Sequence, residues 1–326
     1  MRSFLVTGGA GFMGRDFIRL LLEKKEVEKV VCLDAMTYAG RKENIQQFFS
    51  DSRFVFIQGN ILDQQLVEKI LREEKIDCLV HYAAESHVDR SIENPLAFVQ
   101  TNVLGTVSLL EAVKRFPNVW FHHVSTDEVY GSLGKEGIFY ENSPYQPNSP
   151  YSASKASSDH FVFAYGKTFG LNVTISHASN NFGPYQFEEK LIPKLIHHLI
   201  EKKPFPLYGD GTNVREWTYV EDHSRAIYLL LERGKKNEIY NIGSGQEKSN
   251  LALISVLIEI FAKKTAENKE GLFNLIQFVE DRKGHDFRYS MQCEKIKKLG
   301  FECPMNFEER MATTIDFYLK KLEVLK

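Results

Sequence analysis

The chain has little cysteine: Cys32, Cys78, Cys293 and Cys303 are the four cysteines among 326 residues, and no two of them have CxxC spacing. So low a content excludes a disulfide scaffold and favours a reducing compartment, which predicts buried thiols and a cytoplasmic location. The sequence also lacks an HExxH motif and any Cys/His cluster. We therefore expect no metal site.

An excess of one charge and a long apolar run are missing as well. The 41 Lys+Arg residues against 43 Asp+Glu give a formal net charge of −2, which leaves no electrostatic footprint for nucleic acid. No apolar stretch approaches the roughly 20 residues needed to cross a bilayer, and the N-terminus lacks the apolar core of a signal peptide. We expect neither a nucleic acid nor a membrane as a partner.

The composition that remains is typical of a folded protein, with 43% apolar and 26% charged residues. Short β-branched or aromatic runs predict strands at residues 3–7, 29–33, 54–58, 78–82, 120–125 and 173–177, with helical patterns between them. This alternation predicts an α/β fold with a doubly wound parallel sheet. Later helices are expected at roughly 188–202, 221–233, 249–263 and 306–321. We expect residues 1–180 to form the sheet domain, with some later segments returning to it, and residues 181–326 to form a smaller C-terminal substrate-binding lobe.

A glycine-rich segment, TGGAGFMG at residues 7–14, joins the first strand to a helix. Glycines there let the backbone approach a pyrophosphate, and the helix N-terminus offers free N–H groups. Asp34 ends the next strand, where a carboxylate binds a ribose 2′-OH and repels a 2′-phosphate, so NAD is favoured over NADP. A tight turn without a ligand is the plain alternative. The combination of strand, loop, helix and acid favours an NAD-binding Rossmann fold.

Tyr151 and Lys155 have i, i+4 spacing on a predicted helix, so they share one face. A phenol with a pKa of about 10 is a poor base at neutral pH, but a nearby ammonium and a positive nicotinamide ring favour the phenolate. Ser125 or Thr126, at the end of the preceding strand, is placed to hold a substrate hydroxyl.

The acidic pair Asp127-Glu128 directly follows that strand. Two adjacent carboxylates in a closed pocket do not both ionise easily, so one is pushed toward the protonated acid. A solvated acidic turn is the plain alternative. The position at the carboxyl end of a sheet strand favours a role in the ligand crevice.

These motifs together resemble the extended short-chain dehydrogenase/reductase family. Within it, the STDEVYG segment at residues 125–131 resembles the nucleotide-sugar 4,6-dehydratases, most of all those acting on dTDP-glucose. Further similar stretches occupy residues 83–91, 179–185, 189–193, 215–217, 240–243 and 281–286, so the resemblance covers nearly the whole chain.

The resemblance implies an NAD-dependent hydro-lyase that forms a 4-keto-6-deoxy sugar from a dTDP- or UDP-hexose. Tyr151, with Lys155, would take the O4 proton, and Thr126 would hydrogen-bond O4. Asp127 would be the acid to the C6 hydroxyl and Glu128 the base at C5. The residues expected to bind NAD are Gly8, Gly11, Phe12, Met13, Gly14, Asp34, Thr37, Asn60, Ile61, Ala83, Ala84, Ser86, Thr101, Ser125, Tyr151, Lys155 and Asn180.

The nucleotide diphosphate needs cationic and amide donors, and arginine suits bidentate contact. The residues expected to bind the nucleotide sugar are Ser86, Thr126, Asn181, Lys190, Leu191, Pro206, Tyr208, Arg215, Asn250, Arg282 and His285. Pro206 and Tyr208 are expected to stack on the base. Salt bridges are the plain alternative for the two arginines, and core packing for Tyr208.

Four positions depart from the family pattern: Asn60, His177, Phe182 and Arg15. They leave the nucleotide and the hexose open, with UDP-glucose and UDP-N-acetylglucosamine as alternatives to dTDP-glucose. A 4-epimerase or a decarboxylase is the alternative enzyme, and a non-catalytic NAD-binding regulator the alternative of a different class. The resemblance also implies a homodimer that pairs the helices near residues 95–115 and 150–168.

Overall fold

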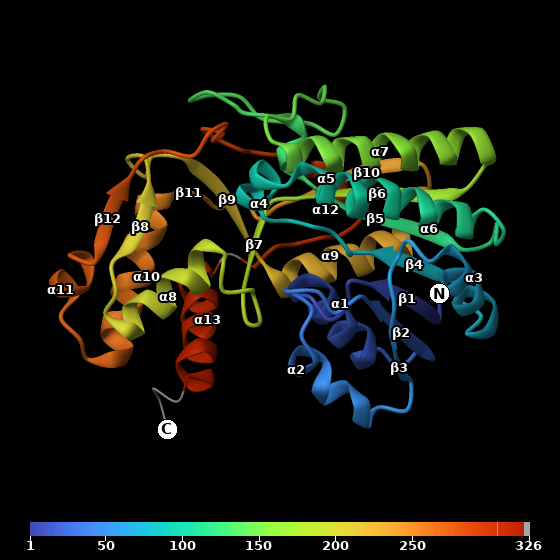
Figure 1. Cartoon of the computed structure of the whole chain (residues 1–326), viewed down its shortest axis with the longest axis horizontal. Helices are drawn as coiled ribbons and strands as arrows, with labels where there is room; N and C mark the ends of the chain where they lie inside the picture. Colours follow the sequence, from blue (N-terminus) through green and yellow to red (C-terminus); the bar gives the residue numbers. More distant parts are fainter. Residues whose placement is uncertain (305, 323–326) are drawn as a thin grey trace.

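The computed structural model describes residues 1–304 and 306–322. Seven parallel strands form one sheet in the order β10-β6-β5-β4-β1-β2-β3 (Figure 1). Their bounds are β1 (Ser3–Thr7), β2 (Lys29–Asp34), β3 (Phe54–Gln58), β4 (Cys78–His81), β5 (Trp120–Thr126), β6 (Asn172–Ala178) and β10 (Glu238–Ile242). The α/β fold class and all six strands expected between Ser3 and His177 are confirmed, with ends shifted by at most one residue.

Helices cover both faces of this sheet because successive strand residues point to opposite sides. Phe4 and Val6 pack with helix α1 (Phe12–Glu23) and α9 (Val220–Arg233), whereas Leu5 packs with α3 (Gln64–Glu73), α6 (Gly105–Val113) and α7 (Pro150–Phe169) on the other face. The shorter helical elements of this part are α2 (Lys42–Ile45), η1 (Gln46–Ser50), α4 (Val88–Glu93), α5 (Pro95–Phe98), η2 (Val99–Leu104), η3 (Asp127–Tyr130) and α12 (Glu294–Lys297).

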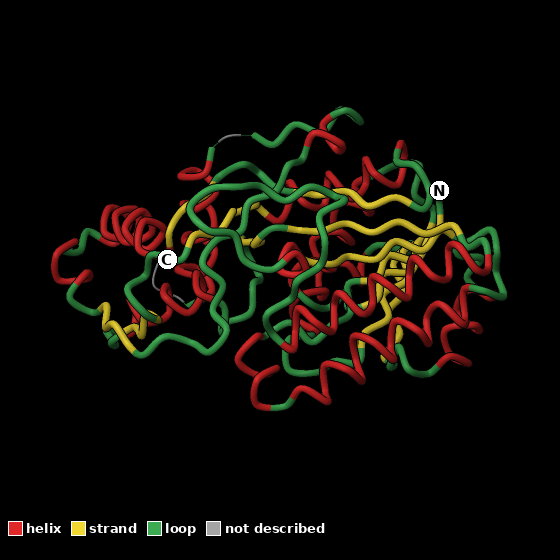
Figure 2. The backbone as a smooth tube through the Cα atoms, turned by 90° about the horizontal axis from the view of Figure 1, so that it is seen from above, coloured by secondary structure: helices red, strands yellow, loops and turns green. Residues whose placement is uncertain are grey.

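A smaller group of elements lies at one end of the sheet, with its helices gathered apart from those of the large sheet (Figure 2). Its strands are β7 (Asn180–Phe182), β8 (Phe205–Tyr208), β9 (Val214–Tyr219), β11 (Glu247–Ser249) and β12 (Ile276–Val279), paired as β11-β9-β7 and β12-β8. Its helices are α8 (Leu191–Glu201), α10 (Asn250–Thr265), α11 (Lys269–Phe273) and α13 (Phe307–Lys321). Of the four later helices that the sequence predicted, α8, α10 and α13 lie here and α9 covers the large sheet, whereas α11 was not expected. The short strands of this lobe were not expected, because several are polar and only three or four residues long.

One expectation about apolar length was wrong. The segment Pro95–Val113 is helical and, by length and composition alone, long and apolar enough to cross a membrane. Such a helix is weak support for a membrane span, since 44% of this apolar stretch is buried in the protein. Its buried side also carries polar contacts: Asn102 Nδ2 donates to Ser154 Oγ at 2.8 Å, and Thr106 Oγ1 donates to Asn102 O. These contacts indicate a core helix with an apolar outer face.

Candidate active site

A cavity of about 330 Å³ opens at the carboxyl ends of β1, β2, β4 and β5, against the small lobe. Every residue expected to bind NAD lines it, from Gly8 on the first loop to Asn180. The five expected catalytic residues, Thr126, Asp127, Glu128, Tyr151 and Lys155, line it as well. The fold thus gathers segments that are far apart in the sequence into one space, because parallel strands deliver their carboxyl ends to the same edge.

The glycine loop is packed too tightly for side chains. A Cβ on Gly8, which has a φ of +67°, would lie 2.6 Å from Ala83 N, and one on Gly14 would lie 2.5 Å from Gly8 O. Glycines therefore let helix α1 begin directly beside the cavity. Gly11 caps α1 without a side chain, so the first helical N–H groups are available to an anion.

Asp34 ends β2 at the edge of the cavity and is 7% exposed. Its carboxylate accepts hydrogen bonds from Ala10 N at 2.9 Å and Met36 N at 2.8 Å. These two bonds orient it and leave lone pairs for a ribose hydroxyl. Burial raises its pKa, partly offset by the backbone donors. The glycine cradle and this fixed carboxylate fit a dinucleotide.

Lys155 is buried on α7 with its Nζ donating to Val124 O at 2.8 Å and lying 3.3 Å from His123 Nε2. Burial lowers its pKa to about 8, opposed by the Asp159 carboxylate. Burial raises the pKa of Tyr151, and the Glu128 charge adds to this, while Thr126 opposes it. Together, burial and the neighbouring acids shift the Tyr151 pKa upward. The lowering expected from Lys155 together with a nicotinamide ring stays a prediction.

Asp127 and Glu128 form the first turn after β5, and Thr126 Oγ1 caps that turn by accepting from Glu128 N at 3.3 Å. Burial, then the neighbouring Glu128, raises the pKa of Asp127 well above its usual range. The pKa of Glu128 is also raised by burial, with Arg282 and Arg215 opposing. Within the described chain Asp127 Oδ2 is buried without a hydrogen-bond partner. The pair is thus a buried acid beside a partly compensated carboxylate.

The expected nucleotide-sugar residues divide into two sets. Ser86, Thr126, Asn181 and Lys190 line the cavity, and Lys190 Nζ donates to Ser86 O at 2.7 Å. The others lie on the small lobe, beyond the residues that line the cavity: Leu191, Pro206, Tyr208, Arg215, Asn250, Arg282 and His285.

The two arginines make few ion pairs. Arg215 donates to Asp286 O at 2.8 Å and lies over the Tyr289 ring at 4.3 Å. Arg282 has an ion pair with Asp89 at 3.5 Å, and its buried Nε is unpartnered in the described part of the chain. Tyr208 is 37% exposed, so core packing does not explain it. His285 Nδ1 donates to the Asp281 carboxylate at 2.6 Å. Donor capacity therefore remains on this rim.

Two buried acids near the site, Asp159 and Glu216, were missed from the sequence. Asp159, His123 and His177 form a buried cluster next to Lys155. The spacing of Tyr151, Lys155 and Asp159 at i, i+4 and i+8 was the available signal. Glu216, buried on β9 with its pKa raised by burial, accepts from Gly245 N at 2.7 Å. Among the described residues, no group of three or more His, Cys, Asp or Glu side chains is arranged so that it could hold a metal ion.

Known proteins are similar to this chain over nearly its full length. A family model described as GDP-mannose 4,6 dehydratase matches residues 5–314. A dTDP-glucose 4,6-dehydratase of Xanthomonas campestris pv. campestris (strain B100) is 45% identical, covering 98% of this chain and 93% of that protein. The crystal structure of a dTDP-glucose 4,6-dehydratase from Streptomyces venezuelae with NAD bound has a TM-score of 0.93 at 43% identity, covering 99% of both chains. A UDP-glucose 4-epimerase of Thermotoga maritima has a TM-score of 0.88 at 28% identity, covering 98% of this chain and 99% of that one.

Proposed function

The chain belongs to the GDP-mannose 4,6 dehydratase family, and on that premise we propose that it is an NAD-dependent dTDP-glucose 4,6-dehydratase. The product is the 4-keto-6-deoxy sugar nucleotide, and one water is lost. The observation that carries this proposal is the buried Asp127-Glu128 pair in the same cavity as Tyr151 and Lys155. The relatives named dTDP-glucose 4,6-dehydratase support the choice of substrate.

The residues divide the chemistry as follows. Tyr151 takes the proton from O4, while Thr126 donates a hydrogen bond to O4 as the ketone forms. Glu128 removes the C5 proton, which the C4 ketone makes acidic. Asp127 gives its proton to the C6 hydroxyl, which leaves as water. Bound NAD would supply the hydride acceptor for C4 and the hydride donor for C6. Glu128 would return a proton, exchanged with solvent, to C5 as C6 receives the hydride.

The cofactor proposal rests on the glycine cradle and on Asp34. The buried carboxylate of Asp34 would lie against a ribose, where it disfavours a 2′-phosphate. The residues expected to bind NAD all line the same cavity, which supports this proposal. Residues 1–180, together with α9, β10 and α12, would thus form the NAD-binding domain, and the other described residues after 180 would form the lobe that binds the nucleotide sugar.

The alternative enzymes explain the site less well. An epimerase returns the hydride to C4 and needs no acid at C6, so it leaves Asp127 and its raised pKa without a task. A decarboxylase must bind a sugar carboxylate, which the neighbouring acids would repel. UDP-glucose and UDP-N-acetylglucosamine remain alternatives for the substrate, because the rim residues Arg215 and Arg282 recognise a diphosphate in any of these nucleotides.

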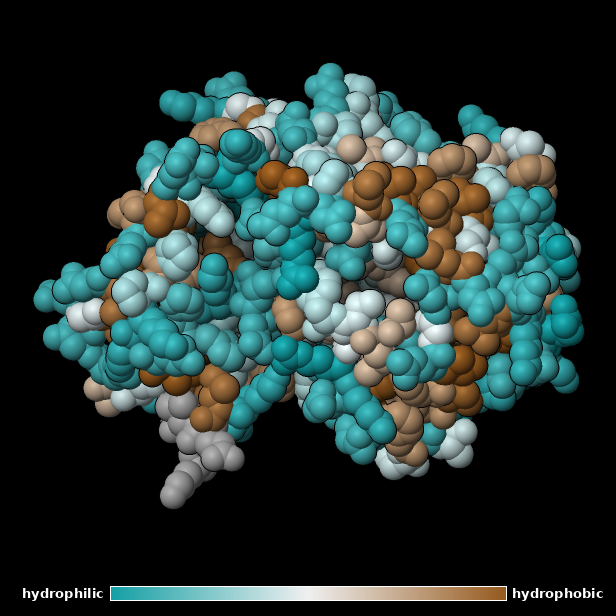
Figure 3. Space-filling model, viewed as in Figure 1, coloured by the Kyte–Doolittle hydropathy of each residue, from teal (hydrophilic) through white to brown (hydrophobic). Residues whose placement is uncertain are grey.

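We also propose a homodimer, with a second copy of this chain covering the apolar faces of α5, η2, α6 and α7. Figure 3 shows apolar side chains gathered over the region where Figure 1 places α5, α6 and α7. The large exposed residues here are Leu96, Val99, Leu104, Phe161 and Phe169, of which Leu96 is 75% exposed. Exposed apolar side chains on neighbouring helices suit an isologous contact.

Analytical ultracentrifugation tests this assembly. The wild-type chain should sediment as a dimer, and Leu104→Glu should sediment as a monomer. A monomeric wild type that floats with liposomes would assign the face to a membrane instead. We propose a cytoplasmic location, in keeping with four cysteines that form no disulfide in the described chain, and cell fractionation tests it.

The central experiment mixes the purified protein, without added NAD, with dTDP-glucose, UDP-glucose, UDP-N-acetylglucosamine or UDP-glucuronate in deuterated water. Mass spectrometry should show loss of one water from dTDP-glucose and one solvent deuterium at C5. Tyr151→Phe should lower kcat by about 10²- to 10⁴-fold, the usual worth of a positioned acid or base. Loss of carbon dioxide, or a C4 epimer of unchanged mass, would overturn the assignment.

A further inference from the structure

A buried polar cluster continues along α7 beyond the catalytic lysine. Asp159 lies one turn after Lys155, and the side chains of Asp159 and His177 have no solvent exposure. Asp159 Oδ2 accepts a hydrogen bond from Ser125 Oγ at 3.0 Å and lies 3.0 Å from His177 Nε2 on β6. A buried carboxylate of this kind requires nearby positive charge or donors.

The hydrogen bonds around His177 decide its protonation. Asn241 Nδ2 donates to Gln292 O at 3.2 Å, which turns Asn241 Oδ1 toward Tyr130. Tyr130 OH donates its one hydrogen to that oxygen at 2.9 Å. The same hydroxyl lies 2.6 Å from His177 Nδ1. Tyr130 has no second hydrogen, so this pair of contacts is satisfied when His177 Nδ1 is the donor.

The other ring nitrogen must also carry a hydrogen. His177 Nε2 faces the Asp159 carboxylate, which only accepts, and it lies 3.0 Å from Tyr145 OH. Burial raises the pKa of Tyr145, so its hydroxyl stays neutral and its hydrogen remains available to Asp159. Two donating ring nitrogens define a cationic imidazolium.

This cation changes the charge balance behind the catalytic tyrosine. Lys155 and Asp159 carry opposite charges, so by themselves they cancel. The Asp159 charge is one of the causes that raise the pKa of Tyr151. An imidazolium beside Asp159 offsets that charge and leaves the buried cluster with a net positive charge.

We propose that His177 is a positioning residue for the dehydratase reaction: a protonated imidazolium that neutralises Asp159, so that the charge of Lys155 acts on Tyr151 and favours its phenolate. His177 acts through Asp159 and Lys155 and does not touch the substrate. The inference rests on the proposed function, since it assigns a role in forming the base that takes the O4 proton.

Titratable groups face His177 from each neighbouring element. They are Asp159 and Lys155 on α7, His123 on β5, Tyr130 on η3, and Tyr145 and Glu141 in the segment between η3 and α7. Burial lowers the pKa of His123 to about 4, so this ring is neutral at the working pH. The pKa of Asp159 is kept below its usual range by its His123 and His177 partners, against the effect of burial. The positive charges of the cluster therefore belong to Lys155 and His177.

The first test reads the protonation of His177 without any turnover. Nitrogen NMR of the wild-type protein with labelled histidine, assigned by the loss of one signal in His177→Gln or His177→Arg, should show both ring nitrogens of His177 protonated at pH 7.5. A ring with a single protonated nitrogen at that pH would overturn the proposal. This measurement holds even if the protein acts on none of the sugars tried, so its failure is distinct from failure of the proposed function.

The second test compares kcat as a function of pH. His177→Gln keeps donor and acceptor groups but removes the charge, so its acid limb should move up by about one pH unit, which lowers kcat about tenfold at pH 6 and little at pH 9. His177→Arg restores the charge and should restore the limb. His122→Gln is the matched control, because His122 is a buried strand histidine bonded only to neutral Thr174 and Ser176. If kcat of His177→Gln fell by the same factor at all pH values, His177 would only pack in the core and the proposal would be wrong.

Discussion

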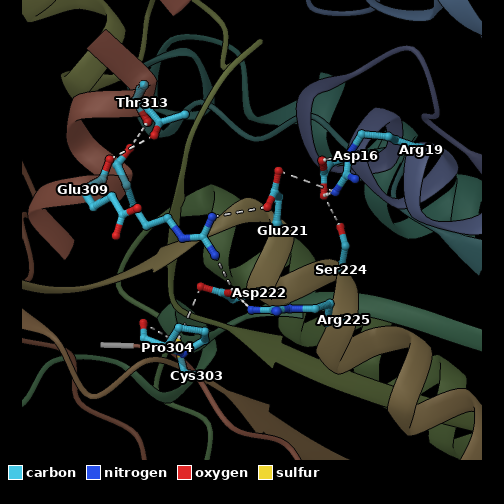
Figure 4. A network of polar contacts seen from close by, with 12 residues as sticks. Asp16, Arg19, Glu221, Asp222, Ser224, Arg225, Cys303, Pro304, Glu309 and Thr313 are labelled. Atoms are coloured by element: carbon cyan, nitrogen blue, oxygen red, sulfur yellow. Dashed lines mark hydrogen bonds and ion pairs between the residues drawn. The ribbon is translucent and has the colours of Figure 1, made fainter. Parts of the chain in front are cut away.

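Two charged networks in this molecule differ in how far water reaches them. The first is the α7 cluster, in which Asp159 and its histidine partners have no exposed side-chain surface. The second, which we term the lobe-junction network, joins α1, α9 and α13 through Asp16, Arg19, Glu221, Asp222 and Arg310 (Figure 4). In this second network Arg19, Glu221 and Arg310 keep 24%, 37% and 26% of their side-chain surface exposed.

The distances show the same contrast. In the lobe-junction network Glu221 lies 3.7 Å from Arg19 and 3.4 Å from Arg310, which are loose ion pairs open to water. In the α7 cluster Asp159 Oδ2 has two partners at 3.0 Å and no solvent. Water and salt screen the first set, whereas removal of one partner in the second leaves a buried charge without compensation. The number of charges in a network is therefore a poor guide to its contribution to the free energy of unfolding.

The largest expected effect comes from breaking the buried cluster. Asp159→Asn keeps the shape but leaves Lys155 and His177 as buried cations without a counter-charge. We expect the free energy of unfolding to fall by about 3–5 kcal/mol, measured by urea denaturation followed by circular dichroism. Adding His177→Gln to that variant should recover part of the loss. Stability within about 1 kcal/mol of wild type in Asp159→Asn would mean that the cluster is not charged.

The next largest effect concerns the stability of the fold at low pH. The folded pKa of His123 is lowered to about 4 by burial, below the value of about 6.5 in an unfolded chain. Its contribution to stability is thus complete above pH 6.5 and is lost as the pH falls toward 4, because only the unfolded chain takes up the proton. Urea midpoints between pH 7 and 4.5 should fall, and His123→Gln should flatten this slope. Arg310→Gln, which adds or removes no group that titrates in that range, should leave the slope unchanged.

The smallest effect is expected at the lobe junction. Arg310→Gln removes two loose ion pairs and a cation–π contact with the Tyr219 ring at 4.5 Å, and we expect a loss of at most about 1 kcal/mol. Raising NaCl from 0.05 to 1 M should reduce that difference, since exposed pairs are screened. The deficit of Asp159→Asn should stay constant over the same range. A salt-independent loss of several kcal/mol in Arg310→Gln would place the lobe-junction network in the buried class.

The sequence predicted the large sheet well and the small lobe poorly. Runs such as residues 3–7 are apolar on both faces, because helices cover both sides of a parallel sheet, so their signal is strong. β11 (Glu247–Ser249) is short and polar, and it pairs with β9, from which α9 and β10 separate it along the chain. Such strands have no pattern of their own, and only the contact creates them.

By itself the sequence determined the glycine loop, the acid at Asp34 and the set of residues that meet at the cavity. These features depend on local spacing and on the rule that parallel strands end at one edge. It did not determine the charge states. Tyr130 and Asn241 meet although they are far apart in the sequence, and their bond is the ground for the hydrogen that we propose on His177 Nδ1. Burial raises the pKa of Tyr151 and Asp127 and lowers that of Lys155, and charged neighbours buried beside them add to or oppose these shifts. Only the tertiary structure decided these, because the energy of a charge depends on its distance from water and from other charges.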